Sequence, residues 1–529
     1  CPSDTNAHPH MNEEHTIAVV HNGIIENYEK LKQRLEKKGY RFVSETDTEV
    51  LAHMLTEYYR GDPVEAIEKV MHRVEGSYAL GIMFLDHPHH IYAARKDSPL
   101  IVGINDTGKF IASDVPAILQ YTRTVYYVEN EEIVCLSNEH TRFCNIDGEP
   151  LEKQPVTIDW DIHAAEKGGY EHFMLKEIHE QPKAVRDTIS PRIHENEIDL
   201  GEIGMTDEEI KNLRKISIVA CGSAYHTGAA GKYVIEELAR IPVETDLASE
   251  FRYRNPIYQE NSLVIIVSQS GETADSLAAL RDAKAHGCKV LSIVNVVGSS
   301  IARESDAVLY TWAGPEISVA TTKAYSCQLA VFYLLALKFA QIRSTITPDT
   351  FQTLLTALKQ LPDQIEGLLS QKEKIQFFAN HYLATEHIFF MGRGIDYAIS
   401  MEGSLKLKEI SYIHSEAYAA GELKHGTISL MEDGTLVVAL ATQDALYPKT
   451  VSNMIEVKTR GAFVMALSTK KHPDIEKYAD YVLYIPETQN LFAGSLAIIP
   501  LQLFAYYVSL GRGLDVDKPR NLAKSVTVE

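Results

Sequence analysis

The sequence predicts an α/β protein in which an α+β layer precedes two doubly wound parallel-sheet domains. From about residue 207, short β-branched runs alternate with helical segments, which is the pattern of βαβ units. Equivalent positions then recur at a steady offset of 172 to 174 residues, in the pairs Gly222 and Gly394, Val264 and Leu436, and Asp306 and Asp480. Such an offset indicates two copies of one domain.

Residues 1–141 are predicted to form the α+β layer. They begin with a strand, a tight turn and a helix in "HTIAVVHNGIIENYEKL", and "HIYAARKDSPLIVGI", "KFIASD" and "VYYVENEEIVCLS" supply further strands. A linker rich in His, Glu and Lys is expected at 142–206.

Each copy is predicted to hold four strands. In the first copy, "KISIVACGSAYHTGAAGKYVIEELARI" and "SLVIIVSQSGETADSLAALRDAKAHG" have the order strand, turn and helix, and "CKVLSIVN" and "DAVLYTW" add two strands. The second copy repeats this series. The predicted segments are 207–346 for the first copy, 347–378 for a helical connector, 379–520 for the second copy and 521–529 for the tail.

Composition excludes several classes of function. The formal net charge of -21 repels the phosphates of nucleic acids, and no apolar run approaches the ~20 residues of a membrane span. The six cysteines are scattered without a C-x-x-C pair, and no signal peptide is predicted. We therefore expect a cytoplasmic protein with neither a nucleic-acid nor a membrane partner.

A phosphate-binding cradle is predicted where two strands of the first copy end. "VSQSGETAD" places Ser268, Gln269, Ser270 and Thr273 at a strand-to-helix turn, and "ACGSAYHTG" brings Gly222 and Ser223 to a neighbouring one. Helix N-termini at such turns present free N–H groups to anions. The alternative is that these hydroxyls only cap helices. Because P-loop and dinucleotide signatures are absent, neither ATP nor NAD is expected, and no cofactor is predicted.

Candidate acid-base groups lie in the second copy. Glu402, Lys406 and Glu409 are spaced i, i+4 and i+7 and share one face of a predicted helix, where burial and the lysine could set the pKa of Glu409. The alternative is an exposed Glu–Lys pair. His425 is a candidate proton shuttle by residue type. In the tail, Lys524 could attack a ketone if held in a closed pocket, whereas a solvated tail lysine is the commoner case.

No metal site is predicted. The histidines near the start (His8, His10, His15 and His21) and the run "HPHH" at 87–90 lack the short spacings of known zinc motifs.

Several segments resemble one family. "NAHPH", "VVHNGIIENY", "FVSETDTEV", "SQSGETADS", "KLKEISYIHSEAYAAGELKHG" and "DVDKPRNLAKSVTVE" are similar, in this order and across the whole chain, to isomerizing glutamine:fructose-6-phosphate aminotransferases, also called glucosamine-6-phosphate synthases. The resemblance implies an N-terminal-nucleophile glutaminase layer followed by two sugar isomerase (SIS) domains. It also implies the reaction: ammonia from glutamine travels inside the protein and aminates fructose 6-phosphate, and isomerisation gives glucosamine 6-phosphate, the entry to amino-sugar synthesis.

The resemblance also assigns roles to residues of the sugar half. Lys524 would form a Schiff base at C2 of the open-chain ketose, Glu409 would move a proton between C1 and C2 with help from Lys406, and His425 of a neighbouring subunit would open the ring, which implies at least a dimer. The sugar phosphate and the sugar itself would be bound by Ser268, Gln269, Ser270, Thr273, Gly222, Ser223, Val319, Glu402 and Ala523.

In the glutaminase half, the resemblance assigns the oxyanion hole to Asn22 and Gly23 and the glutamine amino group to Asp47. The family's nucleophilic cysteine precedes a Gly-Ile-Val-Gly type strand, whereas Cys1 precedes a proline. We therefore expect that about 80 residues are missing upstream of Cys1, and that the chain as given does not hydrolyse glutamine. Two other classes stay open: a phosphosugar isomerase or deglycase, and a non-catalytic phosphosugar-binding protein.

Overall fold

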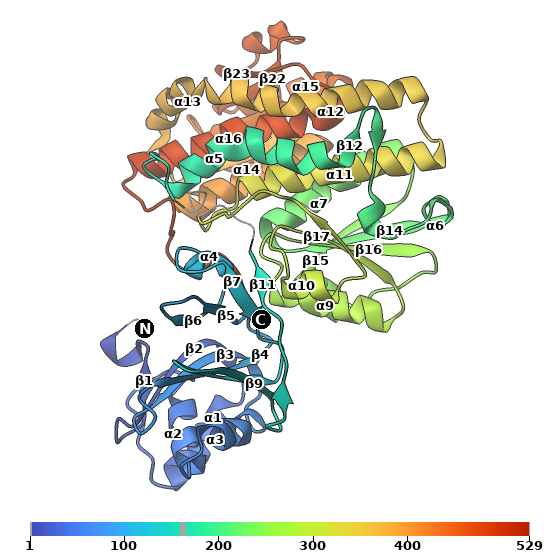
Figure 1. Cartoon of the computed structure of the whole chain (residues 1–529). Helices are drawn as coiled ribbons and strands as arrows, with labels where there is room; N and C mark the ends of the chain where they lie inside the picture. The colour runs from blue at the N-terminus through green and yellow to red at the C-terminus, as the bar shows by residue number, and fades with distance from the viewer. Residues whose placement is uncertain (1–2, 159–165, 528–529) are drawn as a thin grey trace. The chain divides into compact units, whose positions relative to one another are not determined.

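The computed structural model describes residues 3–158 and 166–527 and divides into two compact units (Figure 1). The first unit comprises residues 1–165 with 272–274 and 526–529. The second unit comprises residues 166–271 and 275–525.

The first unit is built on two antiparallel sheets. The larger sheet has the strand order β1-β2-β3-β4-β8-β9-β10, and the smaller has the order β11-β7-β5-β6. Helices α1 (Tyr28–Lys37), α2 (Glu49–Tyr58) and α3 (Pro63–Met71) bury their apolar faces against the larger sheet, and α4 (Val115–Ile118) packs on the smaller one. The strands are β1 (His10–Met11), β2 (Ile17–Ile25), β3 (Gly76–Phe84), β4 (His90–Lys96), β5 (Ile101–Ile104), β6 (Lys109–Ala112), β7 (Thr124–Tyr127), β8 (Glu132–Ser137), β9 (Thr141–Asn145), β10 (Pro150–Leu151) and β11 (Val156–Thr157).

The second unit contains two five-stranded parallel sheets with the same topology, β15-β14-β16-β17-β18 and β20-β19-β21-β22-β23. The matching strand orders confirm the predicted α/β fold class and duplication. The first sheet is formed by β14 (Lys215–Ala220), β15 (Val243–Leu247), β16 (Ser262–Ser268), β17 (Lys289–Val294) and β18 (Ala307–Tyr310). The second is formed by β19 (His387–Gly392), β20 (His414–Ala419), β21 (Leu436–Ala441), β22 (Phe463–Thr469) and β23 (Tyr481–Ile485).

The prediction of four strands per copy was wrong at the sheet edges. β15 and β20 are extra edge strands, and their polar sequences "VETDL" and "HSEAYA" lack the apolar runs that identified the central strands. The register also corrects one equivalence. Ile216 pairs with Leu263, and Ile388 pairs with Leu436, so Leu436 corresponds to Leu263 and not to its neighbour Val264.

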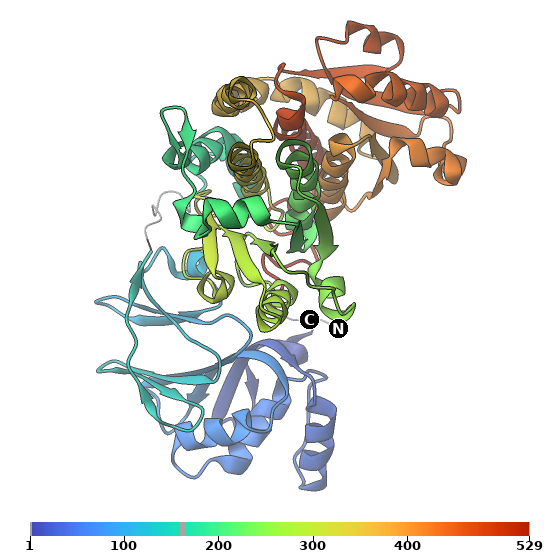
Figure 2. The same ribbon diagram turned by 90° about the vertical axis from the view of Figure 1, so that its right-hand side faces the viewer.

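Long helices fill the space around these sheets (Figures 1 and 2). α7 packs against α11 and α14, and α14 packs against α16. The segment 142–206, predicted as a linker, contributes α5, which packs on α11 and α12. The domain boundaries themselves remain predictions. The helices and short strands are α5 (Phe173–Ile189), α6 (Asp207–Asn212), α7 (Gly222–Ala239), α8 (Ala248–Tyr253), α9 (Ala274–Ala285), α10 (Ser300–Glu304), α11 (Lys323–Arg343), α12 (Pro348–Leu369), α13 (Lys372–Ala379), α14 (Ile395–Ser411), α15 (Tyr447–Lys458), α16 (Ala493–Gly511), β12 (Ile193–His194) and β13 (Glu197–Ile198).

Two helical segments are as long and apolar as a membrane span, contrary to the expectation from the sequence. They are Lys323–Arg343 and Asn490–Gly511. In the most apolar 18-residue stretch of each helix, 83% and 94%, respectively, is buried inside the protein, as in the core helices of a globular protein. Their hydrophobicity is therefore accounted for by packing against the other helices.

The two copies differ in the residues that contact the turn after the third strand in each sheet order, which is β16 in the first copy and β21 in the second. In the second copy, the buried Asp396 on α14 accepts hydrogen bonds from Thr442 N at 2.8 Å and Thr442 Oγ1 at 2.5 Å, in the turn that follows β21. Gln443 Nε2 lies 3.5 Å from the same carboxylate. Burial raises the pKa of Asp396 to about 6, although these hydrogen bonds act in the opposite direction.

Candidate functional site

The turn after β16 has the conformation that the predicted cradle requires. Gly271 adopts φ 68°, and a Cβ there would lie 2.0 Å from Ser299 Oγ, so only glycine fits. Its N–H donates to Ser268 Oγ at 3.0 Å. Ser270 Oγ lies 3.0 Å from Ser525 Oγ, so the hydroxyls of this turn meet the C-terminal tail. Thr273 lies directly before α9.

The neighbouring turn opens α7 and borders a cavity of about 450 Å³. Gly222 has φ 55°, as its equivalent Gly394 has φ 60°, and Ser223 follows it in the first turn of the helix. The cavity is lined by Gly222, His226, Met401, Ser404, Leu405, Lys408, Glu416, Ala417 and Tyr418.

Helix α14 brings Glu402, Lys406 and Glu409 together, as their spacing predicted. Lys406 Nζ lies 3.5 Å from Glu402 Oε1 and 2.5 Å from Glu409 Oε2. Lys406 and Glu402 are fully buried, so this is not an exposed surface pair. Burial alone would lower the pKa of Lys406, but the charges of Glu409 and Glu402 outweigh it and raise that pKa. The lysine is therefore held as a buried cation.

His226, which the sequence analysis did not single out, extends this cluster into the cavity. Its Nδ1 lies 2.8 Å from Glu402 Oε2. Because His226 also lines the cavity beside Gly222, it connects the buried Glu402–Lys406 pair with the surface that the cavity opens to.

Lys524 is not a solvated tail lysine. Its Nζ lies 2.6 Å from Glu316 Oε2, and Glu316 is fully buried. Burial acts to raise the pKa of Glu316, but the Lys524 charge and hydrogen bonds from Thr322 N and Ala324 N outweigh it, so that pKa is lowered. Glu316 is thus a buried carboxylate that holds the tail amine in place.

The tail that carries Lys524 is fixed at further points. The Asp517 carboxylate accepts from Phe173 N at 2.9 Å and Met174 N at 2.8 Å, which caps the start of α5. Its carbonyl accepts from Val319 N at 3.0 Å. Arg520 lies over the Tyr412 ring, 4.2 Å from its centroid. Tails of most domains are poorly ordered unless tied down in this way.

Glu177 is a second buried carboxyl of this region that sequence reasoning missed. Its Oε1 accepts from Ile317 N at 2.6 Å and Ser318 N at 3.2 Å, and Oε2 is buried without a hydrogen-bond partner in the part of the chain that the structure describes. Burial, followed by the charge of Glu316, raises the pKa of Glu177 to about 8.

The raised pKa of Glu177 predicts a pH-dependent stability. Between its ordinary value of 4.5 and about 8, the folded protein binds a proton at Glu177 that the unfolded chain does not, so this group makes the free energy of unfolding fall as pH rises through that window. Glu177→Gln keeps the acceptor but cannot ionise. The quantity compared is the free energy of unfolding of the variant minus that of the unsubstituted protein. We expect this difference to be larger at about pH 9 than at about pH 6, by roughly 1–3 kcal/mol, measured by urea unfolding. The exposed Glu366→Gln is the control, and an equal slope in both variants would refute the assignment.

The remaining predicted sugar-site residues are less enclosed. His425 ends a 3₁₀ helix (Ala420–His425) and is exposed, and its side chain makes no hydrogen bond or ion pair with any described residue. Ala523 is exposed beside Lys524, and Val319 is half-buried in the loop that carries Glu316. The structure therefore brings Lys524, Ser525 and Ser270 together, and separately Glu402, Lys406 and Glu409.

In the first unit, the three residues predicted to contact the substrate glutamine lie around strand β2. Gly23 in β2 has φ 142°, and a Cβ there would lie 2.1 Å from Ser77 O. Asp47 Oδ2 accepts from Ile25 N at 2.7 Å, and the exposed Asn22 donates to Ser113 Oγ at 3.3 Å. Cys1 lies outside the described residues.

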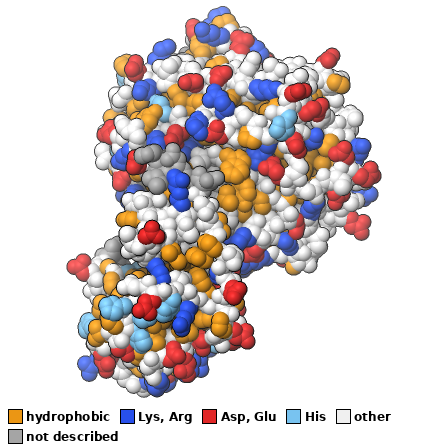
Figure 3. Space-filling model, in the orientation of Figure 1, with side chains coloured by type: hydrophobic (Ala, Val, Ile, Leu, Met, Phe, Trp, Pro, Cys, Tyr) orange, Lys and Arg blue, Asp and Glu red, His pale blue; other side chains and the backbone are white. Residues whose placement is uncertain are grey.

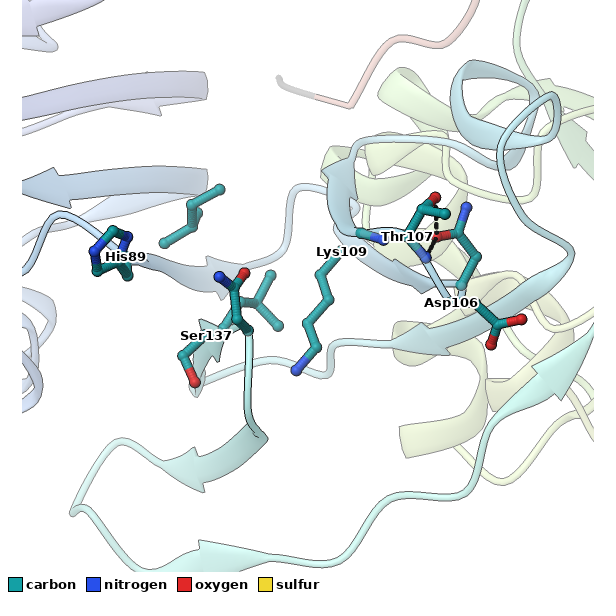
Figure 4. Close-up of a pocket in the computed structure, with 10 residues that line it drawn as sticks. His89, Asp106, Thr107, Lys109 and Ser137 are labelled. Carbon is teal, nitrogen blue, oxygen red and sulfur yellow. Dashed lines mark hydrogen bonds between the residues drawn. The ribbon is translucent and has the colours of Figure 1, made fainter.

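A cavity of about 370 Å³ in the first unit contains none of the predicted residues (Figure 4). Lys109 extends into it between Ser137 and the turn with Asp106 and Thr107. Asn105 Oδ1 orders this turn by accepting from Thr107 N at 2.8 Å and Gly108 N at 2.7 Å. The lining is polar and partly cationic, but no other observation points to a ligand there.

A group of metal-binding side chains also lies in the first unit. His90, Cys135 and His140 have ligand atoms within 4.8 Å of one another. His90 precedes Cys135 by 45 residues and His140 by 50 residues, so no local sequence motif joins the three.

Comparisons with known proteins agree with the fold. The glutamine amidotransferase domain family matches residues 1–120, and the SIS domain family matches residues 209–338 and 382–511. A solved C-terminal domain of glucosamine-fructose-6-phosphate aminotransferase from Francisella tularensis is 39% identical, with a TM-score of 0.65, and covers 67% of this chain and 100% of that one.

Curated relatives extend the similarity to the whole chain. Two proteins named glutamine–fructose-6-phosphate aminotransferase (isomerizing) are similar over all of it and are themselves covered to 87%. They are 57% identical in Caldanaerobacter subterraneus subsp. tengcongensis and 46% identical in Thermus thermophilus. With this identity over its full length, the chain belongs to the family of isomerizing glutamine–fructose-6-phosphate aminotransferases.

Proposed function

We propose that this enzyme makes glucosamine 6-phosphate from fructose 6-phosphate and ammonia, with glutamine as the ammonia source that the family name implies. The observation that carries the proposal is the ion pair between Lys524 and the buried Glu316, because it fixes a primary amine beside the hydroxyl turn after β16. Once this ammonium has given up a proton, the neutral amine can attack a ketone carbon of a bound sugar.

The phosphate would be bound by neutral donors. The turn of Ser268, Gln269 and Ser270, with Thr273 before α9, offers hydroxyls and backbone N–H groups and no P-loop lysine. Gly222, Ser223, Val319, Glu402 and Ala523 are proposed to lie along the sugar.

The chemistry divides between two lysine–carboxylate pairs. We assign imine formation at C2 to Lys524, with loss of water. Ammonia then replaces the lysine nitrogen at C2, which releases the Lys524 amine, and Glu409 transfers a proton from C1 to C2 while its partner Lys406 stays cationic. The exposed His425 fits a role in the active site of a neighbouring subunit, where it would help to open the sugar ring. This role requires at least a homodimer. We place the enzyme in the cytoplasm. In the first unit, Asn22 and Gly23 are proposed to stabilise an oxyanion, and Asp47 to bind the glutamine amino group.

Incubation of the chain with fructose 6-phosphate and ammonium tests the proposal. Mass spectrometry should detect glucosamine 6-phosphate, and a reaction without ammonium is the control. Glucose 6-phosphate alone would instead identify a phosphosugar isomerase. Binding of fructose 6-phosphate without turnover would identify a phosphosugar-binding protein, and either result would overturn the proposed transferase activity.

A further inference from the structure

We propose that His90, Cys135 and His140 of the first unit form a zinc-binding site. Their imidazole nitrogens and thiol sulfur lie within 4.8 Å of one another, and none of them belongs to the proposed glutamine or sugar sites.

The sheet itself places the three side chains together. β4 and β8 are antiparallel neighbours in which His90 lies opposite Ser137, and Tyr92 lies opposite Cys135. Residues directly opposite each other point to the same face, so His90 and Cys135 are diagonal neighbours on one face of the sheet. His140 lies in the tight turn from β8 to β9, where its carbonyl accepts from Ser137 N at 3.0 Å.

The ligand set fits zinc better than the other common divalent ions. A thiolate and two imidazoles are preferred ligands of Zn²⁺, whereas Mg²⁺ and Ca²⁺ prefer oxygen. Tetrahedral zinc with bonds of about 2.0–2.3 Å separates its ligand atoms by roughly 3.3–3.8 Å. Zinc binding therefore requires the three ligand atoms to move closer together from their present upper limit of 4.8 Å. Three protein ligands would leave the fourth position to water.

The surroundings of His90 supply a second observation. Its Nδ1 is buried and, within the described ranges, makes no hydrogen bond. A buried polar atom without a partner is costly, and coordination of a metal would remove that cost.

Aromatic packing is the competing explanation of this histidine cluster. The His90 ring is stacked on Tyr92 at 5.9 Å and meets His87 edge-on at 5.8 Å. Figure 3 shows several histidine side chains close together on one face of the first unit. Ring packing accounts for neighbouring histidines, but it does not account for a cysteine within reach of both ligand nitrogens.

Zinc and cobalt binding to the full 529-residue chain test the proposal. Competition with a chromophoric chelator should give about one Zn²⁺ per chain, and Co²⁺ should produce a thiolate-to-cobalt charge-transfer band. Cys135→Ser should abolish the band, and His140→Gln should weaken binding by more than the roughly 10- to 100-fold that loss of an outer-shell partner costs.

Two matched controls should bind as the unsubstituted chain does. Cys144→Ser removes a half-buried thiol from the adjacent strand β9, and His89→Gln removes a neighbouring histidine that lines the 370 Å³ cavity. Substoichiometric binding, a charge-transfer band that persists in Cys135→Ser, or equal losses in the controls would each overturn the site. If Cys135→Ser does not fold, the zinc affinity of His140→Gln, a substitution in the β8–β9 turn, decides. A loss no larger than that of the two controls would overturn the site.

Discussion

Lys524→Arg should reduce formation of glucosamine 6-phosphate by roughly 1,000-fold or more. Arginine keeps the positive charge beside the buried Glu316, so the tail should stay docked, but a guanidinium does not form an imine. Loss of a covalent nucleophile removes at least as much rate as the roughly 10²–10⁴-fold of a general acid or base. The measurement is the rate of product formation from fructose 6-phosphate and ammonia.

Borohydride reduction separates this chemical role from a structural one. In the unsubstituted protein, reduction in the presence of fructose 6-phosphate should attach the sugar to Lys524, and peptide mapping should locate it there. Lys518→Arg changes an exposed lysine six residues earlier in the same tail and should leave both the rate and the labelling intact. Product formation at an undiminished rate by Lys524→Arg, or a label on another lysine, would refute the assignment.

Lys406→Met should lower the free energy of unfolding by about 3–5 kcal/mol, because it leaves the fully buried Glu402 without its cation. Breaking a buried ion pair by removing one partner is costly, whereas the intact pair adds little. Urea unfolding measures the change.

A second substitution should recover part of that loss. Glu402→Gln in the Lys406→Met background removes the uncompensated charge and keeps an acceptor for His226, so the double variant should be more stable than Lys406→Met alone. Lys183→Met breaks the exposed pair with Asp187 at the same i, i+4 spacing and should cost less than about 0.5 kcal/mol. If Lys406→Met lowers the free energy of unfolding by no more than Lys183→Met does, the buried Glu402 does not depend on Lys406 for compensation of its charge.

The sequence predicted the parts of this protein that depend on local pattern. The βαβ series gave the duplication, and the spacing of Glu402, Lys406 and Glu409 gave a common helix face, because both follow from the periods of strands and helices. The turn at Ser268 and Ser270 followed from its position at the end of an apolar strand. The edge strands were missed because their faces are partly polar.

Partners that are distant in the chain could not be predicted in the same way. Glu316 lies 208 residues before Lys524, in a loop whose only sequence signal is an acidic residue among apolar and hydroxyl side chains. Glu177 lies in a helix within the segment predicted as a linker, and its pKa is raised first by burial and then by the charge of Glu316. Burial and charge pairing of this kind are properties of the folded chain.

The carboxylate of Asp396 gives the duplication an asymmetry. It accepts the hydrogen bonds that the strand-to-helix turn at Thr442 and Gln443 would otherwise offer to an incoming anion. The position 172 residues earlier in the first copy is Ala224, whose methyl group cannot do this. The turn after β21 in the second copy is thus occupied by an internal carboxylate, while the equivalent turn after β16 in the first copy stays open to an external ligand.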